Sequence, residues 1–206
     1  MRLVIFGTVG AGKTSFINAL NNKLGYKVYA EPLNKNPYFD KLYEQFQDKN
    51  SNTYKMELFM LSERMKQFLE SQNLENVVFD RGVMDTLIFA NANYEEGNLD
   101  KRDWDTYRTF FETNIIPAIF NNENIKSYEL VVYLRVSDET SINRINQRAI
   151  PGELRVKQHF WELLNSLYEQ WYLEWIDKIP FIVIDGNIDD IDEKVDLFFK
   201  KISNFK

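Results

Sequence analysis

The sequence predicts an α/β fold in which a five-stranded parallel sheet carries helices on both faces. Short apolar segments alternate along the 206 residues with longer segments of helical periodicity, the pattern of strands joined by helical crossovers. A glycine-rich stretch also stands directly between the first apolar segment and the first helical one. The length suits one domain, and no Ser-, Pro- or Gly-rich linker divides residues 1–206.

Each expected element rests on its local pattern. Apolar, partly β-branched runs predict five strands at Leu3–Phe6, Lys27–Ala30, Val77–Phe79, Leu130–Leu134 and Phe181–Ile184. Helical spacing of apolar residues predicts helices at about 13–24, 37–48, 53–72, 83–92, 102–121, 138–148, 156–178 and 189–204. Ligands of a parallel sheet bind outside the carboxyl ends of its strands. The residues that follow each strand are therefore the first candidates for a site.

The composition narrows the classes of function. The chain has no cysteine, which excludes disulfides, thiolate zinc sites and a cysteine nucleophile. Its net charge of −6 disfavours a nucleic-acid partner. No apolar run approaches the roughly 20 residues that span a bilayer, and the stretch that leads into the phosphate loop lacks the basic and apolar regions of a signal peptide. We therefore expect a soluble cytoplasmic protein without a membrane partner.

The glycine-rich stretch fits the phosphate-loop pattern G-x-x-x-x-G-K-[ST] at every fixed position. Its glycines let backbone N–H groups converge on one anion, and the next helix adds its positive end. Lys13 is expected to reach the β- and γ-phosphates and Thr14 to ligate Mg²⁺. The pattern thus predicts nucleoside triphosphate binding by Gly7, Thr8, Val9, Gly10, Ala11, Gly12, Lys13, Thr14 and Ser15. The alternative is an ordinary glycine-rich turn.

Charged residues follow two further strands. Asp80 ends the third strand, where its carboxylate is expected to face the Mg²⁺ held by Thr14; the alternative is a helix cap. Arg81 follows and suits charge on a phosphoryl group in transfer. Glu31 stands between the second strand and Pro32, where a carboxylate could take a proton from an alcohol. A solvated loop acid is the alternative for Glu31.

Two pairs of polar residues lie on helices. Arg144 and Arg148 share one face four residues apart, which suits an anion and a lid closing at about residues 144–156. A solvated helix face is the alternative. Glu57 and Arg64 lie two turns apart beside an apolar stripe, and their spacing does not decide between a pocket and water.

The ordered set of motifs resembles the deoxynucleoside kinases, in particular the bacterial deoxyadenosine/deoxyguanosine kinase branch. The markers run nearly end to end: Gly7–Ser15, Glu31-Pro32, Asn36-Pro37-Tyr38, Met56–Arg64, Phe79-Asp80-Arg81, Tyr133-Leu134-Arg135-Val136 and Arg144–Glu153. The resemblance implies a P-loop kinase fold and transfer of the γ-phosphoryl of ATP·Mg²⁺ to a deoxynucleoside 5′-hydroxyl. It also implies a homodimer, with helices such as 102–121 in the interface.

The resemblance further implies individual roles. Glu31 would be the general base, Arg81 would contact the hydroxyl and the phosphoryl group, and Asp80 would serve Mg²⁺. It also implies that Tyr43 and Glu153 hold the sugar 3′-hydroxyl and that Arg64 and Asp85 contact the base. On the donor side, Arg144 and Arg148 would bind the phosphates, and the adenine would lie against Asp185, Gly186 and Asn187.

The sequence departs from the family pattern at two positions. Ile150 stands where the lid usually has a third arginine, and Arg155 is a candidate replacement. Glu57 stands where most members have Gln to pair with the base. A carboxylate only accepts hydrogen bonds, which matches the neighbouring N1–H and N2–H donors of guanine and opposes adenine unless the acid is protonated. We therefore expect a preference for deoxyguanosine.

Three alternatives stay open. A deoxyadenosine or broad-specificity kinase would need the same motifs. A nucleoside monophosphate kinase is disfavoured because Ala30, rather than an arginine, precedes Glu31-Pro32. A non-catalytic nucleotide-binding module is disfavoured because residues 34–37 read Asn-Lys-Asn-Pro and lack the Asp of a guanine-reading N-K-x-D motif.

Overall fold

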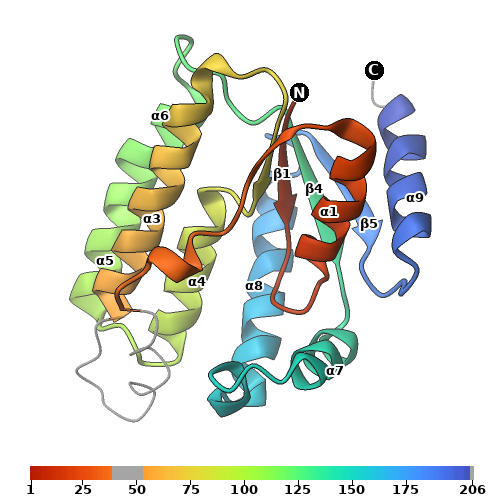
Figure 1. Cartoon of the computed structure of the whole chain (residues 1–206). Coiled ribbons are helices and arrows are strands. Elements are labelled where there is room, and N and C mark those ends of the chain that lie inside the picture. The colour runs from red at the N-terminus through yellow and green to blue at the C-terminus, as the bar shows by residue number, and fades with distance from the viewer. Residues whose placement is uncertain (39–52, 205–206) are drawn as a thin grey trace.

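The computed structural model describes residues 1–38 and 53–204, in which five parallel strands form one sheet. The strands are β1 (Arg2–Phe6), β2 (Lys27–Tyr29), β3 (Val77–Asp80), β4 (Leu130–Arg135) and β5 (Phe181–Asp185). Each end lies within one residue of the sequence prediction. The spatial order is β2-β3-β1-β4-β5, with β1 at the centre (Figure 1). The predicted α/β fold with a parallel sheet is thus confirmed.

Helices connect the strands as expected, and one of the expected helices is divided in two. The helices are α1 (Lys13–Leu24), α3 (Thr53–Glu70), α4 (Met84–Glu95), α5 (Lys101–Phe110), α6 (Ile116–Phe120), α7 (Asp138–Arg148), α8 (Gln158–Trp175) and α9 (Ile191–Ser203). Most of the helix expected at 37–48, with Tyr43, lies outside the described residues. Among the described residues, no helix is both long and apolar enough to cross a membrane.

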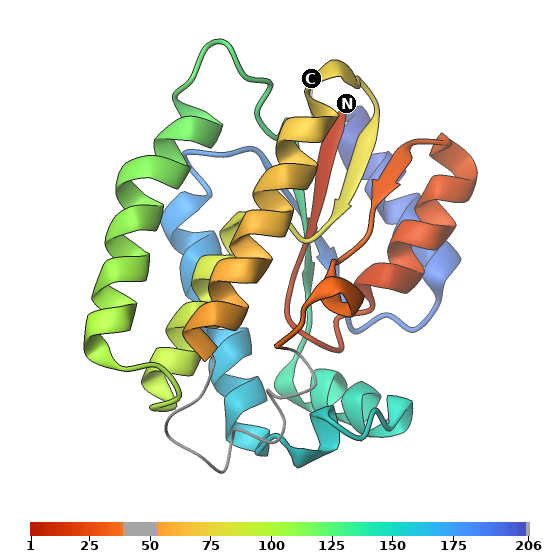
Figure 2. The same ribbon diagram turned by 60° about the vertical axis from the view of Figure 1, so that its left-hand side comes forward.

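The helix predicted at 102–121 is divided by a π-helical turn at Phe111–Ile115. Pro117 explains the division, because it has no N–H to donate to the carbonyl of Thr113, where a regular α-helix requires a bond. The chain absorbs the missing bond in the wider turn. Helices α5 and α6 then continue along one line beside α3 (Figure 2).

The two faces of the sheet are covered by different helices. Along β1, Val4 and Phe6 belong to one buried cluster, and Leu3 and Ile5 belong to the other. This alternation follows from the period of two in an extended strand. Helices α3, α4 and α8 cover the first face, and α1 and α9 cover the second (Figure 1). Because both faces are covered by helices, a ligand can approach the central strands only at their amino or carboxyl ends.

The amino end of the sheet contains a fully buried arginine, Arg2. Its Nη1 and Nη2 donate to the carbonyl and hydroxyl oxygens of Ser71 at 2.8 and 2.7 Å, and its Nε donates to the carbonyl of Ser127 at 3.0 Å. The guanidinium also lies over the rings of Phe68 and Phe79. Protein groups thus satisfy this cation, and it fastens the loops before β3 and β4 to β1.

Candidate active site

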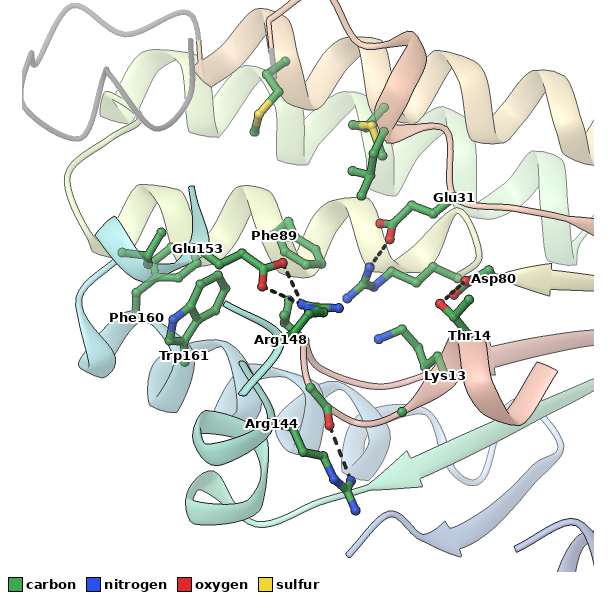
Figure 3. A pocket seen from close by; sticks show the side chains of 18 of the residues that line it. Lys13, Thr14, Glu31, Asp80, Phe89, Arg144, Arg148, Glu153, Phe160 and Trp161 are labelled. Carbon is green, nitrogen blue, oxygen red and sulfur yellow. Dashed lines mark hydrogen bonds and ion pairs between the residues drawn. The ribbon is translucent and has the colours of Figure 1, made fainter. Parts of the chain in front are cut away.

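A cavity of about 330 Å³ opens at the carboxyl end of the sheet (Figure 3). Its wall combines the loop after β1, the ends of β2 and β3, helices α3 and α4, and the segment from α7 to α8. The volume lies in the range of small-molecule sites. The polar lining residues are Lys13, Thr14, Ser15, Glu31, Glu57, Arg64, Asp80, Arg81, Asn93, Arg144, Arg148 and Glu153.

The phosphate loop (residues 7–14) lies tightly against the start of α7. Gly10 has a φ of 77°, and a Cβ there would lie 2.4 Å from the carbonyl oxygen of Ser141. Only glycine fits this position. Of the predicted ATP-binding loop, Val9, Gly10, Gly12, Lys13, Thr14 and Ser15 line the cavity, whereas Gly7, Thr8 and Ala11 are buried behind it.

Lys13 is a buried cation at the start of α1. Its Nζ donates to the carbonyl oxygen of Thr8 at 2.6 Å. Burial, together with the positive charge of Arg81, lowers the pKa of Lys13 to about 7. A phosphate in the loop would favour the charged form, so this lysine suits an anionic ligand.

Thr14 and Asp80 place two oxygens side by side. The Thr14 hydroxyl donates to Asp80 Oδ2 at 3.0 Å. Asp80 Oδ1 is buried, and no hydrogen bond reaches it within the described part of the chain. Such an oxygen pair suits a hard cation that completes its shell with phosphate and water. Among the described residues, no group of three or more His, Cys, Asp or Glu could hold a metal ion.

Glu31 lies between two arginines. Arg64 Nη2 donates to its Oε1 at 2.7 Å, and Arg81 Nη1 donates to its Oε2. Burial opposes ionisation of this carboxyl, but the charges of Arg81, Arg64 and Lys13 outweigh burial and hold its pKa below the usual value. Glu31 is therefore an ionised carboxylate at neutral pH, and Figure 3 shows it facing the same space as Lys13.

Arg81 is held from behind by two buried groups. Its φ of 68° is unusual for a residue other than glycine. The Tyr168 hydroxyl lies 3.2 Å from Arg81 Nε and donates to Asp85 Oδ1 at 2.6 Å, and Asp85 Oδ2 accepts from the N–H of Gly82. Asp85 is fully buried and does not line the cavity. In this position Asp85 supports Arg81, and its expected contact with the base stays a prediction.

Glu57 and Arg64 both line the cavity, which decides the question that their spacing left open. Asn93 Nδ2 on α4 donates to Glu57 Oε1 at 2.8 Å. Burial raises the pKa of Glu57 to about 8, against the opposing effects of Arg64 and Asn93. Arg64 Nε is buried, and no hydrogen bond reaches it among the described residues.

The two arginines of α7 reach different parts of the site (Figure 3). Arg148 Nη2 donates to both carboxylate oxygens of Glu153 at 2.6 Å. Arg144 donates to the carbonyl of Gly186 and to Asp189 Oδ1, each at 2.7 Å. Arg144 thus contacts the loop after β5 and also lines the cavity, and its expected contact with the donor phosphates stays a prediction.

Several residues that were expected to contact a ligand do not line the cavity. Asp185, Gly186 and Asn187 do not line the cavity; Asn187 instead donates to Asp185 Oδ1 at 2.9 Å. Arg155 is exposed outside the cavity and does not replace the missing cation at Ile150.

Sequence reasoning missed Asn93, Tyr168 and the aromatic wall of Phe89, Phe160 and Trp161. The helix predicted at 83–92 stops one residue short of Asn93, so its place facing α3 was hidden. Phe160 serves both the core and the cavity, and the apolar character of its helix indicates only the core. A buried polar residue near the end of an apolar helix was the only signal available.

Comparison with known proteins agrees with this geometry. The model of the deoxynucleoside kinase family matches residues 3–205. The chain belongs to the deoxynucleoside kinase family. This confirms the resemblance found in the sequence motifs, including its bacterial branch.

Relatives in the family differ in the base that their names state. The chain is 31% identical over 173 residues to a deoxyadenosine/deoxycytidine kinase of Bacillus subtilis, covering 82% of this chain and 75% of that protein. It is 28% identical to a deoxyguanosine kinase of Lactobacillus acidophilus, covering 90% and 80%. A deoxyadenosine kinase structure from M. mycoides with bound dATP is 37% identical, covers 98% of this chain and 100% of that one, and has a TM-score of 0.85.

Proposed function

We propose that the protein transfers the γ-phosphoryl group of ATP to the 5′-hydroxyl of a purine deoxynucleoside. The observation that carries the proposal is the ionised Glu31 held between Arg64 and Arg81 in the cavity that Lys13 also lines. A carboxylate beside a phosphate loop suits a hydroxyl acceptor. Catalysis then consists mainly of positioning and charge neutralisation.

The proposed reaction assigns each charged group one task. Glu31 accepts the proton of the 5′-hydroxyl as that oxygen bonds to the γ-phosphorus and the bond to ADP breaks. Arg81, held by Tyr168 and Asp85, contacts the hydroxyl and stabilises charge on the phosphoryl group in transfer. Lys13 neutralises the donor phosphates.

Mg²⁺ is the divalent ion that we propose for this site. Thr14 Oγ1 and Asp80 Oδ1, which has no hydrogen-bond partner in the described part of the chain, would hold it, directly or through water. Bound there, Mg²⁺ would neutralise charge on the donor phosphates.

We propose that residues 144–156 act as a lid. Arg148 lies at the cavity and would exchange Glu153 for donor phosphate when ATP binds. Glu153 and Tyr43 would then hold the sugar 3′-hydroxyl. Arg144 keeps the loop Asp185–Asn187 in place beside the donor adenine. Lid closure would exclude water from the reacting phosphoryl group.

The purine assignment rests on Arg64 and Glu57. Arg64 lines the cavity, and its Nε is a donor without a partner among the described residues; such a donor suits N7, an acceptor that both purines carry. An ionised Glu57 would favour deoxyguanosine, as its sequence position suggests. The raised pKa of Glu57 supports deoxyadenosine as a second candidate, because a protonated acid can donate to adenine N1.

A monophosphate acceptor is disfavoured by the same ion pairs. Arg64 and Arg81 already neutralise Glu31, so neither is a free cation for an acceptor phosphate. A non-catalytic module has no use for an ionised Glu31 at this place.

Steady-state phosphorylation of each of the four deoxynucleosides with ATP·Mg²⁺ tests the proposal. We expect turnover of at least one purine deoxynucleoside and a large loss of turnover in Glu31→Gln. The matched control is Glu70→Gln, which changes an exposed glutamate of α3 and keeps wild-type turnover. Transfer to monophosphates alone, or to no acceptor, would contradict the proposal.

We also propose a homodimer, with α5 and α6 in the interface. Phe110 on α5 is 43% exposed, unusual for so large an apolar side chain. Sedimentation of the wild type should give twice the monomer mass, and Phe110→Glu should shift it toward the monomer. A monomeric wild type would contradict this assignment.

A further inference from the structure

The pair Glu57 and Asn93 joins α3 to α4 inside the cavity. Each side chain is 2% exposed, and both line the cavity. Asn93 Nδ2 donates to Glu57 Oε1 at 2.8 Å. Within the part of the chain that the structure describes, no hydrogen bond reaches Glu57 Oε2. Among the described residues, the carboxyl group therefore has Oε2 open to a ligand, and Oε1 keeps a second acceptor position beside its bond from Asn93.

The orientation of the Asn93 amide is fixed by its own partners. Its Oδ1 accepts from Asn98 Nδ2 at 3.3 Å, and its main-chain carbonyl accepts from the N–H groups of Asn98 and Leu99. The amide therefore presents its NH₂ to Glu57. Because Oε1 receives that donor, a proton on Glu57 belongs on Oε2, the oxygen left for a ligand.

The charges around Glu57 oppose one another. Arg64 lies two turns further along α3, and its positive charge favours the ionised acid. Arg64 is, however, already paired with Glu31. The negative charge of Glu31, after β2, favours the neutral acid, and the Tyr107 phenol on α5 also interacts with Glu57. Burial has the largest effect and raises the pKa of Glu57 to about 8. At neutral pH most molecules therefore hold a neutral acid beside Asn93.

The two protonation states match different purines. A neutral acid has one O–H donor and an acceptor oxygen, which pair with the N1 acceptor and the amino group of adenine. A carboxylate only accepts, and pairs with the N1–H and N2–H donors of guanine. A mismatch at a buried polar edge leaves a group without a partner and strongly reduces turnover of the wrong substrate.

We propose that Glu57, fixed by Asn93, selects the base through its protonation state, so that the neutral acid accepts deoxyadenosine and the carboxylate accepts deoxyguanosine. This proposal rests on the proposed function and deepens it. Deoxyadenosine is then favoured at neutral and acidic pH. The preference for deoxyguanosine that the sequence predicts is then expected only at alkaline pH.

A competition assay tests the proposal. Both deoxynucleosides are supplied together, and the ratio of their kcat/KM values, deoxyguanosine over deoxyadenosine, is measured from about pH 6.5 to about pH 8.5. Titrations of Lys13, Glu31 and ATP act on both reactions and cancel in the ratio. If each form accepts only its matching base, the ratio rises about tenfold per pH unit. A ratio independent of pH, with turnover present, would overturn the inference and leave the kinase assignment intact.

A binding measurement separates the inference from catalysis. Calorimetry in buffers of different ionisation enthalpy counts the protons released on binding near neutral pH. Deoxyguanosine should release close to one proton per site, and deoxyadenosine should release almost none. Equal proton release for the two nucleosides would overturn the inference even if no turnover were detected.

Two variants test the parts of the pair. Glu57→Gln mimics the neutral acid, because Asn93 fixes the amide oxygen and leaves the NH₂ for the base; its ratio should favour deoxyadenosine at every pH. Glu63→Gln makes the same change on α3 outside the cavity and should keep the wild-type pH dependence. Asn93→Ala removes a donor that favours ionisation and should move the rise in the ratio to higher pH. A purely structural role for Asn93 would lower both rates without moving it.

Discussion

The two ends of the sheet both bury arginines, and they satisfy them differently. At the amino end, Arg2 donates to Ser71 and Ser127 and lies against two aromatic rings. The protein itself therefore supplies the partners of this guanidinium. At the carboxyl end, Arg64 and Arg81 share Glu31, while Arg64 Nε and Asp80 Oδ1 lack partners among the described residues. These unsatisfied polar atoms belong to residues that line a cavity, as expected where a ligand completes the site.

The largest effect is expected at Lys13. Lys13→Met should lower kcat by about 10²-fold or more, because the donor phosphates lose their buried cation. The variant should also lose a pH dependence of stability. The folded-state pKa of Lys13, about 7, lies below its unfolded value, so the unfolded chain binds more protons in between and wild-type stability rises with pH.

Denaturant titrations of both proteins check this second effect. The wild-type free energy of unfolding should rise relative to Lys13→Met by about 1.4 kcal/mol per pH unit between about pH 7 and 10. If the plots of unfolding free energy against pH are parallel for the two proteins, the pKa of Lys13 is not lowered in the folded state.

Arg2→Met tests the amino end. Removing the guanidinium leaves the buried carbonyls of Ser71 and Ser127 without their donors and should cost about 2 to 4 kcal/mol of unfolding free energy. The kinetic constants, measured well below the melting temperature, should stay near wild type. Arg102→Met is the control, since that side chain is 94% exposed. A loss of activity without a loss of stability would reverse the proposed division between the two ends.

Gly10→Ala tests the fit of the phosphate loop. Because the added Cβ meets the Ser141 carbonyl oxygen at 2.4 Å, the loop must shift, and KM for ATP should rise about tenfold or more. Gly25→Ala is a matched control, with a φ of 64° but open space around the added Cβ. It should cost about 1 kcal/mol of stability and leave KM unaltered. Equal KM changes would assign the effect to backbone strain alone.

The smallest effect is expected behind Arg81. Tyr168→Phe removes only the hydroxyl that contacts Arg81 Nε and Asp85, and kcat should fall about three- to tenfold with little change in KM. Tyr172→Phe is the control, because no hydrogen bond of its hydroxyl occurs within the described residues. A change confined to KM would mean that Tyr168 acts on binding.

The site was predictable from sequence where chemistry directly follows a strand. Glu31, Asp80 and the phosphate loop meet because parallel strands end at one edge. The support of Arg81 by Asp85 was not predictable, because a position four residues after Arg81 gives no information on which side of the chain the carboxylate faces. Tyr168 and Asn93 depend on how α8 and α4 dock. The raised pKa of Glu57 depends on burial, which no local pattern encodes.

The double hydrogen bond between Arg148 and Glu153 has a thermodynamic consequence. Under the proposed roles, one partner serves the donor and the other serves the acceptor sugar, and each is occupied by the other in the free protein. Whichever substrate arrives first bears the cost of separating them, and the second finds its residue already released. Binding of ATP and of the deoxynucleoside is then synergistic, and each raises the affinity for the other by the same factor.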